Sequence, residues 1–157
     1  MGGWLLLFVI GAGVLSPLFF LFSAMTTYYP LFAEGTWQTL TTPASPSFHP
    51  LWKPTILFEM IGSFLVVAFG IYAAVQLFAE RPRAPALAIA FLVANLLLAV
   101  VDRILVSWIP AASARANSAD LIQAAAAAAV WIPYFKLSKR VKGTYDLSSN
   151  RLTVSLR

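Results

Sequence analysis

The sequence predicts an all-α membrane protein, a compact bundle of four transmembrane helices. Of its 157 residues, 60% are hydrophobic and only 11% are charged, whereas about a quarter of the residues in a soluble globular domain are charged. The mean hydropathy of +0.79 agrees with a membrane class. Four apolar stretches approach or exceed the roughly 20 residues that a helix needs to cross a bilayer.

The four predicted spans differ in how clearly the sequence marks them. The first carries no charge, and the second begins with Pro54, whose missing N–H is harmless in a first turn. Pro110 marks the end of the third, and the fourth is short and rich in alanine. The predicted ranges are about 4–25, 54–78, 86–109 and 119–135. We expect the first span to be retained rather than cleaved as a signal peptide, because the opening "MGG" has no Lys or Arg and the apolar run is long.

The basic residues predict the orientation of these spans. Eight of the 11 Lys and Arg residues lie between the second and third spans or in the C-terminal tail. Because cytoplasmic loops carry an excess of Lys and Arg, we expect both termini in the cytoplasm and a long outer loop at 26–53. A transmembrane domain at 1–135 is then followed by a basic cytoplasmic tail at 136–157. The segment "TYDLSSNRLTVSL" in this tail alternates around a turn and is compatible with a small hairpin.

The basic segment beyond the fourth span predicts contact with anionic lipids. Basic residues near a membrane surface attract such lipids by about 1 kcal/mol each. The candidates are Lys136, Lys139, Arg140 and Lys142. A nucleic-acid partner is not expected, since no aromatic residues interleave these charges in a stacking pattern.

Polar side chains in three spans predict an intramembrane cluster at one depth. Glu59 lies about five residues into the second span, Arg103 about six residues before the end of the third, and Asp120 at the start of the fourth. Ionisable residues inside a membrane are costly and are candidates for function. The predicted cluster consists of Glu59, Asn95, Asp102, Arg103, Asp120 and Gln123.

The adjacent charges Asp102 and Arg103 cannot pair with each other, because neighbouring residues on a helix point about 100° apart. We expect Arg103 to pair with Glu59 or Asp120. For Asp102 the expected partners are Arg115 or Lys53. Small residues at helical spacing indicate close packing of the helices. They include Gly62, Ser63 and Gly70 in the second span, and Ala86, Ala90 and Ala94 in the third.

Three interpretations of the predicted cluster stay open. It fixes the register of the helices, it forms a site for a proton, an ion or a small polar ligand, or it performs acid–base chemistry. The sequence disfavours catalysis, because the single histidine, His49, lies in a Pro-rich loop and no metal-binding or phosphate-binding motif is present. The absence of cysteine excludes thiolate chemistry. We expect no enzymatic activity, no cofactor and no metal.

Three segments together resemble one family. They are the opening "GGWLLLFVIGAGVLSPL", the stretch "LFEMIGSFLVVAFGIYAAVQLFAERPRAP" and the ending "VWIPYFKLSKRVKGTY". They are similar to bacterial inner-membrane proteins grouped as domain of unknown function 2569, and the resemblance runs from Gly2 to about Tyr145. It implies four spans in a bacterial cytoplasmic membrane and no assigned activity. The alanine-rich fourth span and the tail beyond Tyr145 depart from the family pattern.

The sequence therefore predicts a small polytopic inner-membrane protein of unassigned activity. We expect an accessory or assembly subunit of a membrane complex, or a homo-oligomer, with membrane lipids and a membrane protein as partners. The reason is size, since four short helices enclose little volume. The alternative is a small transporter or channel with a polar site in the outer half of the bundle.

Overall fold

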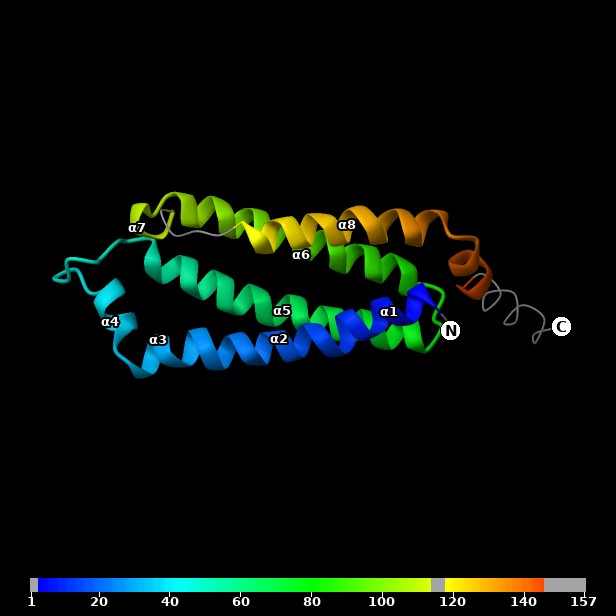
Figure 1. Ribbon diagram of the computed structural model, residues 1–157, viewed down its shortest axis with the longest axis horizontal. Coiled ribbons are helices and arrows are strands. Elements are labelled where there is room, and N and C mark those ends of the chain that lie inside the picture. Colours follow the sequence, from blue (N-terminus) through cyan, green and yellow to red (C-terminus); the bar gives the residue numbers. More distant parts are fainter. Residues whose placement is uncertain (1–2, 114–117, 146–157) are drawn as a thin grey trace.

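The computed structural model describes residues 3–113 and 118–145, and every regular element in these residues is a helix (Figure 1). The elements are α1 Trp4–Ile10, the π-helical turn η1 Gly11–Leu15, α2 Ser16–Ser23, the π-helical turn η2 Ala24–Tyr28, α3 Tyr29–Ala33, α4 Thr36–Thr41, α5 Trp52–Phe78, α6 Ala84–Ser107, α7 Pro110–Ser113 and α8 Ala119–Leu137. A terminal helix, Lys139–Tyr145, follows α8 after a bend of 61°.

Three stretches of this chain are long and apolar enough to cross a membrane. They are the continuous helical run Trp4–Ala33, called the first run below, and the helices α5 and α6. The helix α8 and the terminal helix pass the same test together as one bent pair. Helices suit this setting, because a bilayer offers no water to satisfy backbone N–H and C=O groups. The all-helical class is confirmed, and the chain has three candidate spans, or four if the bent pair is one span.

The bundle has two distinct ends (Figure 1). The first run begins, and α5 and α8 finish, at what we call the basic end. The opposite end, called the loop end, carries α3, α4 and α7. Consecutive long helices therefore run in alternating directions along the bundle.

The first run is longer than the sequence indicated. The predicted span stopped near Met25, whereas the helix continues to Ala33. Proline lacks an N–H and its ring pushes away the carbonyl four residues earlier. The residues four before Pro17 and Pro30 lie in η1 and η2, so each wider π-helical turn accommodates the proline that follows. The first eight residues of the predicted outer loop are therefore helical, and α4 occupies six more.

Small residues set the closest approach between helices. A Cβ added to Gly13 of the first run would lie 3.0 Å from the Cβ of Ala74 in α5. One added to Gly70 would lie 2.9 Å from Cε2 of Phe91 in α6 and 3.3 Å from the carbonyl oxygen of Ala12. The first run, α5 and α6 thus meet around Gly70, on the small-residue face that the sequence predicted to point inward.

The predicted alanine spacing in the third span marks the outside of α6 rather than its inside. Ala86 and Ala90 are exposed, whereas Ala84 and Ala88 are fully buried. The period of four residues was recognised correctly, but the sequence did not fix which of two alternating alanine rows faces the neighbouring helices.

A ring junction around Phe8 joins three helices near the basic end. Phe8 is 4% exposed. Its ring centroid lies 4.9 Å from that of Phe135 and 5.1 Å from that of Trp131, both in α8, and 6.3 Å from that of Phe91 in α6. The rings meet edge to face, the geometry that aromatic quadrupoles favour. This junction connects the first run to α8.

The terminal helix packs across the basic end. Its residues Val141 and Tyr145 are buried, and the Tyr145 hydroxyl donates a hydrogen bond of 3.0 Å to the carbonyl oxygen of Leu77. The Ser138 hydroxyl accepts a hydrogen bond from the N–H of Val141 at 3.5 Å and so caps the helix. Of the predicted hairpin, Thr144 and Tyr145 are helical and the rest lies outside the described residues.

We expect Phe8→Ala to lower the free energy of unfolding by about 3 kcal/mol, because truncating a buried phenylalanine leaves a cavity. Denaturation of the purified protein in detergent measures the change. Phe19→Ala is the matched control, since the Phe19 ring lies on the same run but is 68% exposed. Equal losses in the two variants would contradict a central role for the junction.

Gly70→Ala is expected to reduce the free energy of unfolding by about 1–3 kcal/mol, as overpacking does in a tight core. The backbone oxygen of Ala12 cannot rotate out of the way. Gly11→Ala serves as the control, because its added Cβ would meet nothing within 4 Å and alanine is the better helix former. If Gly70→Ala were as stable as the native chain, the helix crossing would be looser than described.

Candidate functional site

Four helical elements bring polar side chains together near the loop end. Tyr28 closes η2 in the first run, Glu59 lies in the second turn of α5, and Asp102 and Arg103 lie near the end of α6. Asp120 lies in the first turn of α8. We call these five residues, Tyr28, Glu59, Asp102, Arg103 and Asp120, the polar layer.

Tyr28 supplies the hydrogen bond that the Glu59 carboxylate makes. The Tyr28 hydroxyl donates to Oε1 of Glu59 at 3.2 Å, and Ser63 lies beside the same hydroxyl. Tyr28 was not among the predicted cluster, because the predicted first span ended at Met25 and residue 28 fell in the predicted outer loop at 26–53. The sequence signal was weak: a proline such as Pro30 does not have to end a membrane helix, because a wider turn before it can accommodate its ring.

The carboxylates of the polar layer lie within electrostatic range of one another. Glu59 experiences the charges of both Asp102 and Asp120, and Asp102 experiences those of Asp120 and Arg103. The prediction that acids from three helices occupy one level agrees with these interactions. The polar layer thus contains three carboxylates and one guanidinium.

Arg103 does not form the predicted ion pairs. Among residues 3–113 and 118–145, no salt bridge joins it to Glu59 or Asp120, and Glu59 instead accepts from Tyr28. The charge of Arg103 acts on Asp102, its neighbour in sequence. The predicted pairing failed because sequence gives the depth of a side chain, but not the rotation of its helix. Arg115, one expected partner of Asp102, lies outside the described residues.

Three buried polar atoms near the loop end have no hydrogen-bond partner in the described part of the chain. They are Oδ1 of Asp102, Nη1 of Arg103 and Oγ1 of Thr55. Thr55 is only 2% exposed and lies one helical turn from Glu59 on the same face of α5. An unsatisfied buried polar group costs about 1–3 kcal/mol. The polar layer is therefore incomplete as a structural pairing within this part of the chain.

Two residues of the predicted cluster stand apart from the polar layer. Asn95 is half-buried about two turns deeper than Asp102 on α6, and Gln123 is exposed on α8. Within the described ranges neither side chain makes a hydrogen bond. The four charged members of the predicted cluster thus act on one another electrostatically, whereas Asn95 and Gln123 make no hydrogen bond in the described residues.

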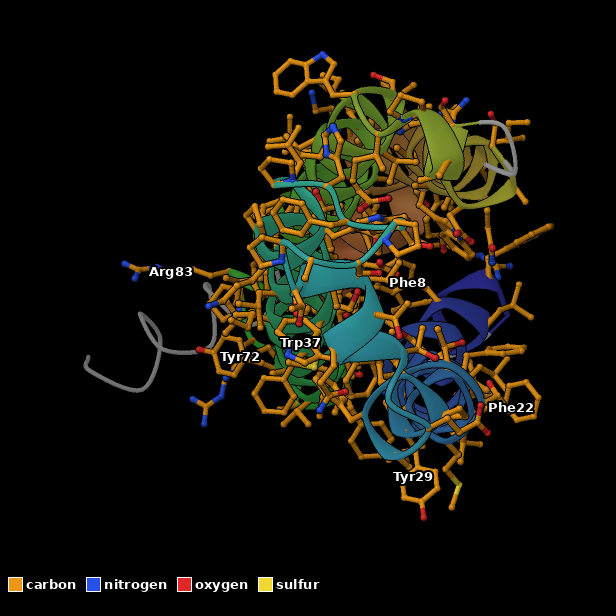
Figure 2. The ribbon with its side chains drawn as sticks, turned by 90° about the vertical axis from the view of Figure 1, so that its left-hand side faces the viewer. Phe8, Phe22, Tyr29, Trp37, Tyr72 and Arg83 are labelled. Carbon is orange, nitrogen blue, oxygen red and sulfur yellow. The ribbon has the colours of Figure 1, made fainter. Side chains whose placement is uncertain are left out.

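The first run and α8 meet at the basic end and diverge toward the loop end (Figures 1 and 2). Their ring contacts include Trp4 with Trp131, at a centroid distance of 6.2 Å. The face of α8 that carries Trp131 continues through Ala127 to Asp120, at helical spacings of four and seven residues. Asp120 and the neighbouring Gln123 are exposed. The α8 face that meets the first run at one end is thus uncovered beside the polar layer.

The chemistry of the polar layer favours positive partners. Like charges on neighbouring helices repel in a medium of low dielectric, and a proton, a cation or a hydrogen-bond donor relieves that repulsion. In the residues that the structure describes, no three His, Cys, Asp or Glu side chains are grouped closely enough to hold a metal ion.

The predicted lipid-contact residues all lie at the basic end. Lys136 is in the last turn of α8, and the other three are in the terminal helix, where they are exposed around the buried Val141. The arginines of the α5–α6 turn, Arg81 and Arg83, are exposed at the same end. The structure thus separates a basic end from a loop end that holds acids.

One comparison with known proteins gave a match. A family model described as "Protein of unknown function (DUF2569)" matches residues 1–145. Searches of curated proteins and of solved structures gave no match. The matched range includes the first run, α5, α6, α8 and the terminal helix.

We expect Tyr28→Phe to lower the free energy of unfolding by about 1–2 kcal/mol, the usual range for a hydrogen bond to an ionisable group. In a Glu59→Met background the same change is expected to cost nothing further, because the acceptor is gone. Tyr29→Phe is the control, since Tyr29 is 72% exposed. A double-mutant cycle in detergent gives the coupling energy, and fully additive losses would contradict the bond.

Proposed function

The chain belongs to the family of proteins of unknown function DUF2569, and from this premise we propose that it works as a subunit of a larger membrane assembly. The assembly is either a complex with another membrane protein, in which this chain is an accessory subunit, or a homo-oligomer. The partner packs against the first run and α8 at the loop end and completes the polar layer.

The uncovered face of α8 beside the polar layer carries this proposal. At the basic end the face is held by Trp4 and Phe8 of the first run, but at the loop end Asp120 and Gln123 are exposed on it. Polar side chains at membrane depth are seldom left facing lipid, and in known membrane proteins they face other helices or a water-filled cavity. A helix from a partner supplies the missing cover.

The chain's charges and its family support a location and an orientation for this subunit. We place it in a bacterial cytoplasmic membrane with the basic end toward the cytoplasm, because Lys and Arg accumulate on that side. Both termini are then cytoplasmic, and the residues from α4 to Trp52 form an outer connection. Lys136, Lys139, Arg140 and Lys142 contact anionic lipids of the inner leaflet.

A second function, a small transporter or channel, is favoured by the unpaired buried atoms. Oδ1 of Asp102 and Nη1 of Arg103 are buried and have no hydrogen-bond partner in the described residues, and water molecules or a small polar ligand would satisfy them. In that case Glu59 and Asp102 bind the transported proton or small polar ligand from the outer side. Their neutral amide variants would keep the fold and lose the flux.

Site-specific photo-crosslinking in native membranes tests the assembly. A photoreactive phenylalanine analogue replaces Gln123, on the uncovered face, or Ile122, which is 65% exposed on a different face of α8. We expect a discrete protein adduct from position 123 and little from position 122, because only the first faces the partner. Mass spectrometry of the adduct identifies it as another protein or as a second copy of this chain.

Purification of the tagged protein in a mild detergent, at native expression level, is the companion measurement. A partner present in stoichiometric amount, or a homo-oligomer of defined mass, would agree with the crosslink. A monomer without a crosslink at position 123 would contradict the assembly and leave the transporter as the better account. Equal adducts at positions 122 and 123 would contradict the location of the interface.

A further inference from the structure

A pocket at the basic end lies outside the polar layer and has no part in the proposed assembly. It has a volume of about 500 Å³ and lies where α5 turns into α6. We call it the turn pocket. Its lining residues are Tyr72, Gln76, Arg81, Pro82, Arg83 and Leu87.

The backbone of the turn fixes the two arginines beside the end of α5. Glu80 has a φ of 52°, in the left-handed region. The N–H of Glu80 donates to the carbonyl oxygen of Leu77, and the N–H of Arg81 donates to that of Gln76, each at 3.1 Å. This pair of bonds is the Schellman ending of a helix. Pro82 follows and prevents the helix from continuing, so Arg81 and Arg83 stay within a turn of fixed shape.

Charge in the turn pocket is positive. Arg81 and Arg83 line it, whereas the nearest acid in sequence, Glu80, is not among its lining residues. The Tyr72 hydroxyl and the Gln76 amide add neutral hydrogen-bonding groups. Figure 2 shows Arg83 and Tyr72 projecting from the same side of the molecule. Guanidinium groups bind phosphate oxygens with two parallel hydrogen bonds.

An apolar strip runs from the turn pocket toward the middle of α5. Helical spacing places Ala68, Leu65 and Ile61 on the same face as Tyr72, four, seven and eleven residues away. Ala68 is exposed, and Leu65 and Ile61 are 59% and 53% exposed. A ligand that fits both features carries a phosphate at one end and hydrocarbon at the other.

We propose that the turn pocket binds the headgroup phosphate of an anionic phospholipid, whose acyl chains lie along the strip of α5. Basic pockets between membrane helices on the cytoplasmic side are known to bind anionic headgroups. The strip selects a lipid over a free phosphate, because a soluble anion gains nothing from exposed Leu65 and Ile61. The site differs from the diffuse contact expected of the terminal helix, because here two arginines line one defined pocket.

Titration of the purified full chain with phosphatidylglycerol, followed by native mass spectrometry, tests the site. We expect Arg81→Gln with Arg83→Gln to weaken phosphatidylglycerol binding by about tenfold or more, given the contribution of each basic residue at a membrane surface. The matched control, Lys136→Gln with Lys142→Gln, removes the same charge at the same end and is expected to change binding less than about threefold. Both pairs are exposed, so the fold is retained.

Two further arms separate the possible ligands and the role of geometry. Phosphatidylcholine, which has the same chains but no net charge, and glycerol 3-phosphate, which has no chains, are both expected to bind at least about tenfold more weakly than phosphatidylglycerol. Arg81→Lys with Arg83→Lys keeps the charge and the membrane orientation but loses the planar fork. We expect it to bind with an affinity between those of the native chain and the glutamine variant.

Four results would overturn the proposal. They are native affinity in the Arg81→Gln, Arg83→Gln variant, an equal loss in the lysine control pair, equal binding of phosphatidylcholine, and binding of glycerol 3-phosphate as tight as that of the lipid. An equal loss in the lysine control pair would mean that the lipid is held by diffuse electrostatic attraction and not by the pocket. Equally tight binding of glycerol 3-phosphate would mean that the pocket binds a soluble phosphate. None of these results bears on the partner at the loop end.

Discussion

The close crossing of the first run and α5 is the constraint on which the rest of the arrangement depends. Gly13, Ala74 and Gly70 leave no room for a further methyl group between the two helices and α6. Membrane helices have no hydrophobic driving force between them, so such contact is a main source of their cohesion. Because the tight contact and the ring junction of Phe8 lie toward the basic end, the first run and α8 are free to diverge toward the loop end. The uncovered face beside the polar layer is a consequence of that geometry.

The two prolines of the first run connect this packing to the polar layer. Each follows a π-helical turn, and the run therefore continues to Ala33 instead of stopping where the sequence becomes polar. That extension carries Tyr28 to Glu59. Without it the Glu59 carboxylate would face the same unsatisfied environment as Oδ1 of Asp102. A local backbone irregularity thus gives Glu59 its hydrogen-bond partner within the described part of the chain.

The two ends of the molecule present opposite chemistry. The basic end combines the terminal helix with the Schellman turn of α5, and both place guanidinium and ammonium groups where a charged membrane surface is expected. The loop end gathers three carboxylates, of which Glu59 accepts a hydrogen bond from the Tyr28 hydroxyl and Asp102 experiences the charge of Arg103. One end is therefore suited to lipid headgroups, and the other to a proton or to donors of a partner helix.

The sequence by itself determined the all-helical class, the apolar stretches that form the three to four candidate spans, and the placement of Glu59, Asp102 and Asp120 toward one end of the bundle. These properties follow from hydropathy and from the rise per residue of a helix, both of which are one-dimensional. The sequence did not determine that Tyr28 rather than Arg103 reaches Glu59, that Asn95 and Gln123 stand apart, or that Ala84 and Ala88 face inward instead of Ala86 and Ala90. Those outcomes depend on the rotation of each helix and on its crossing with its neighbours. Residues distant in sequence set both, so only the tertiary structure decided them.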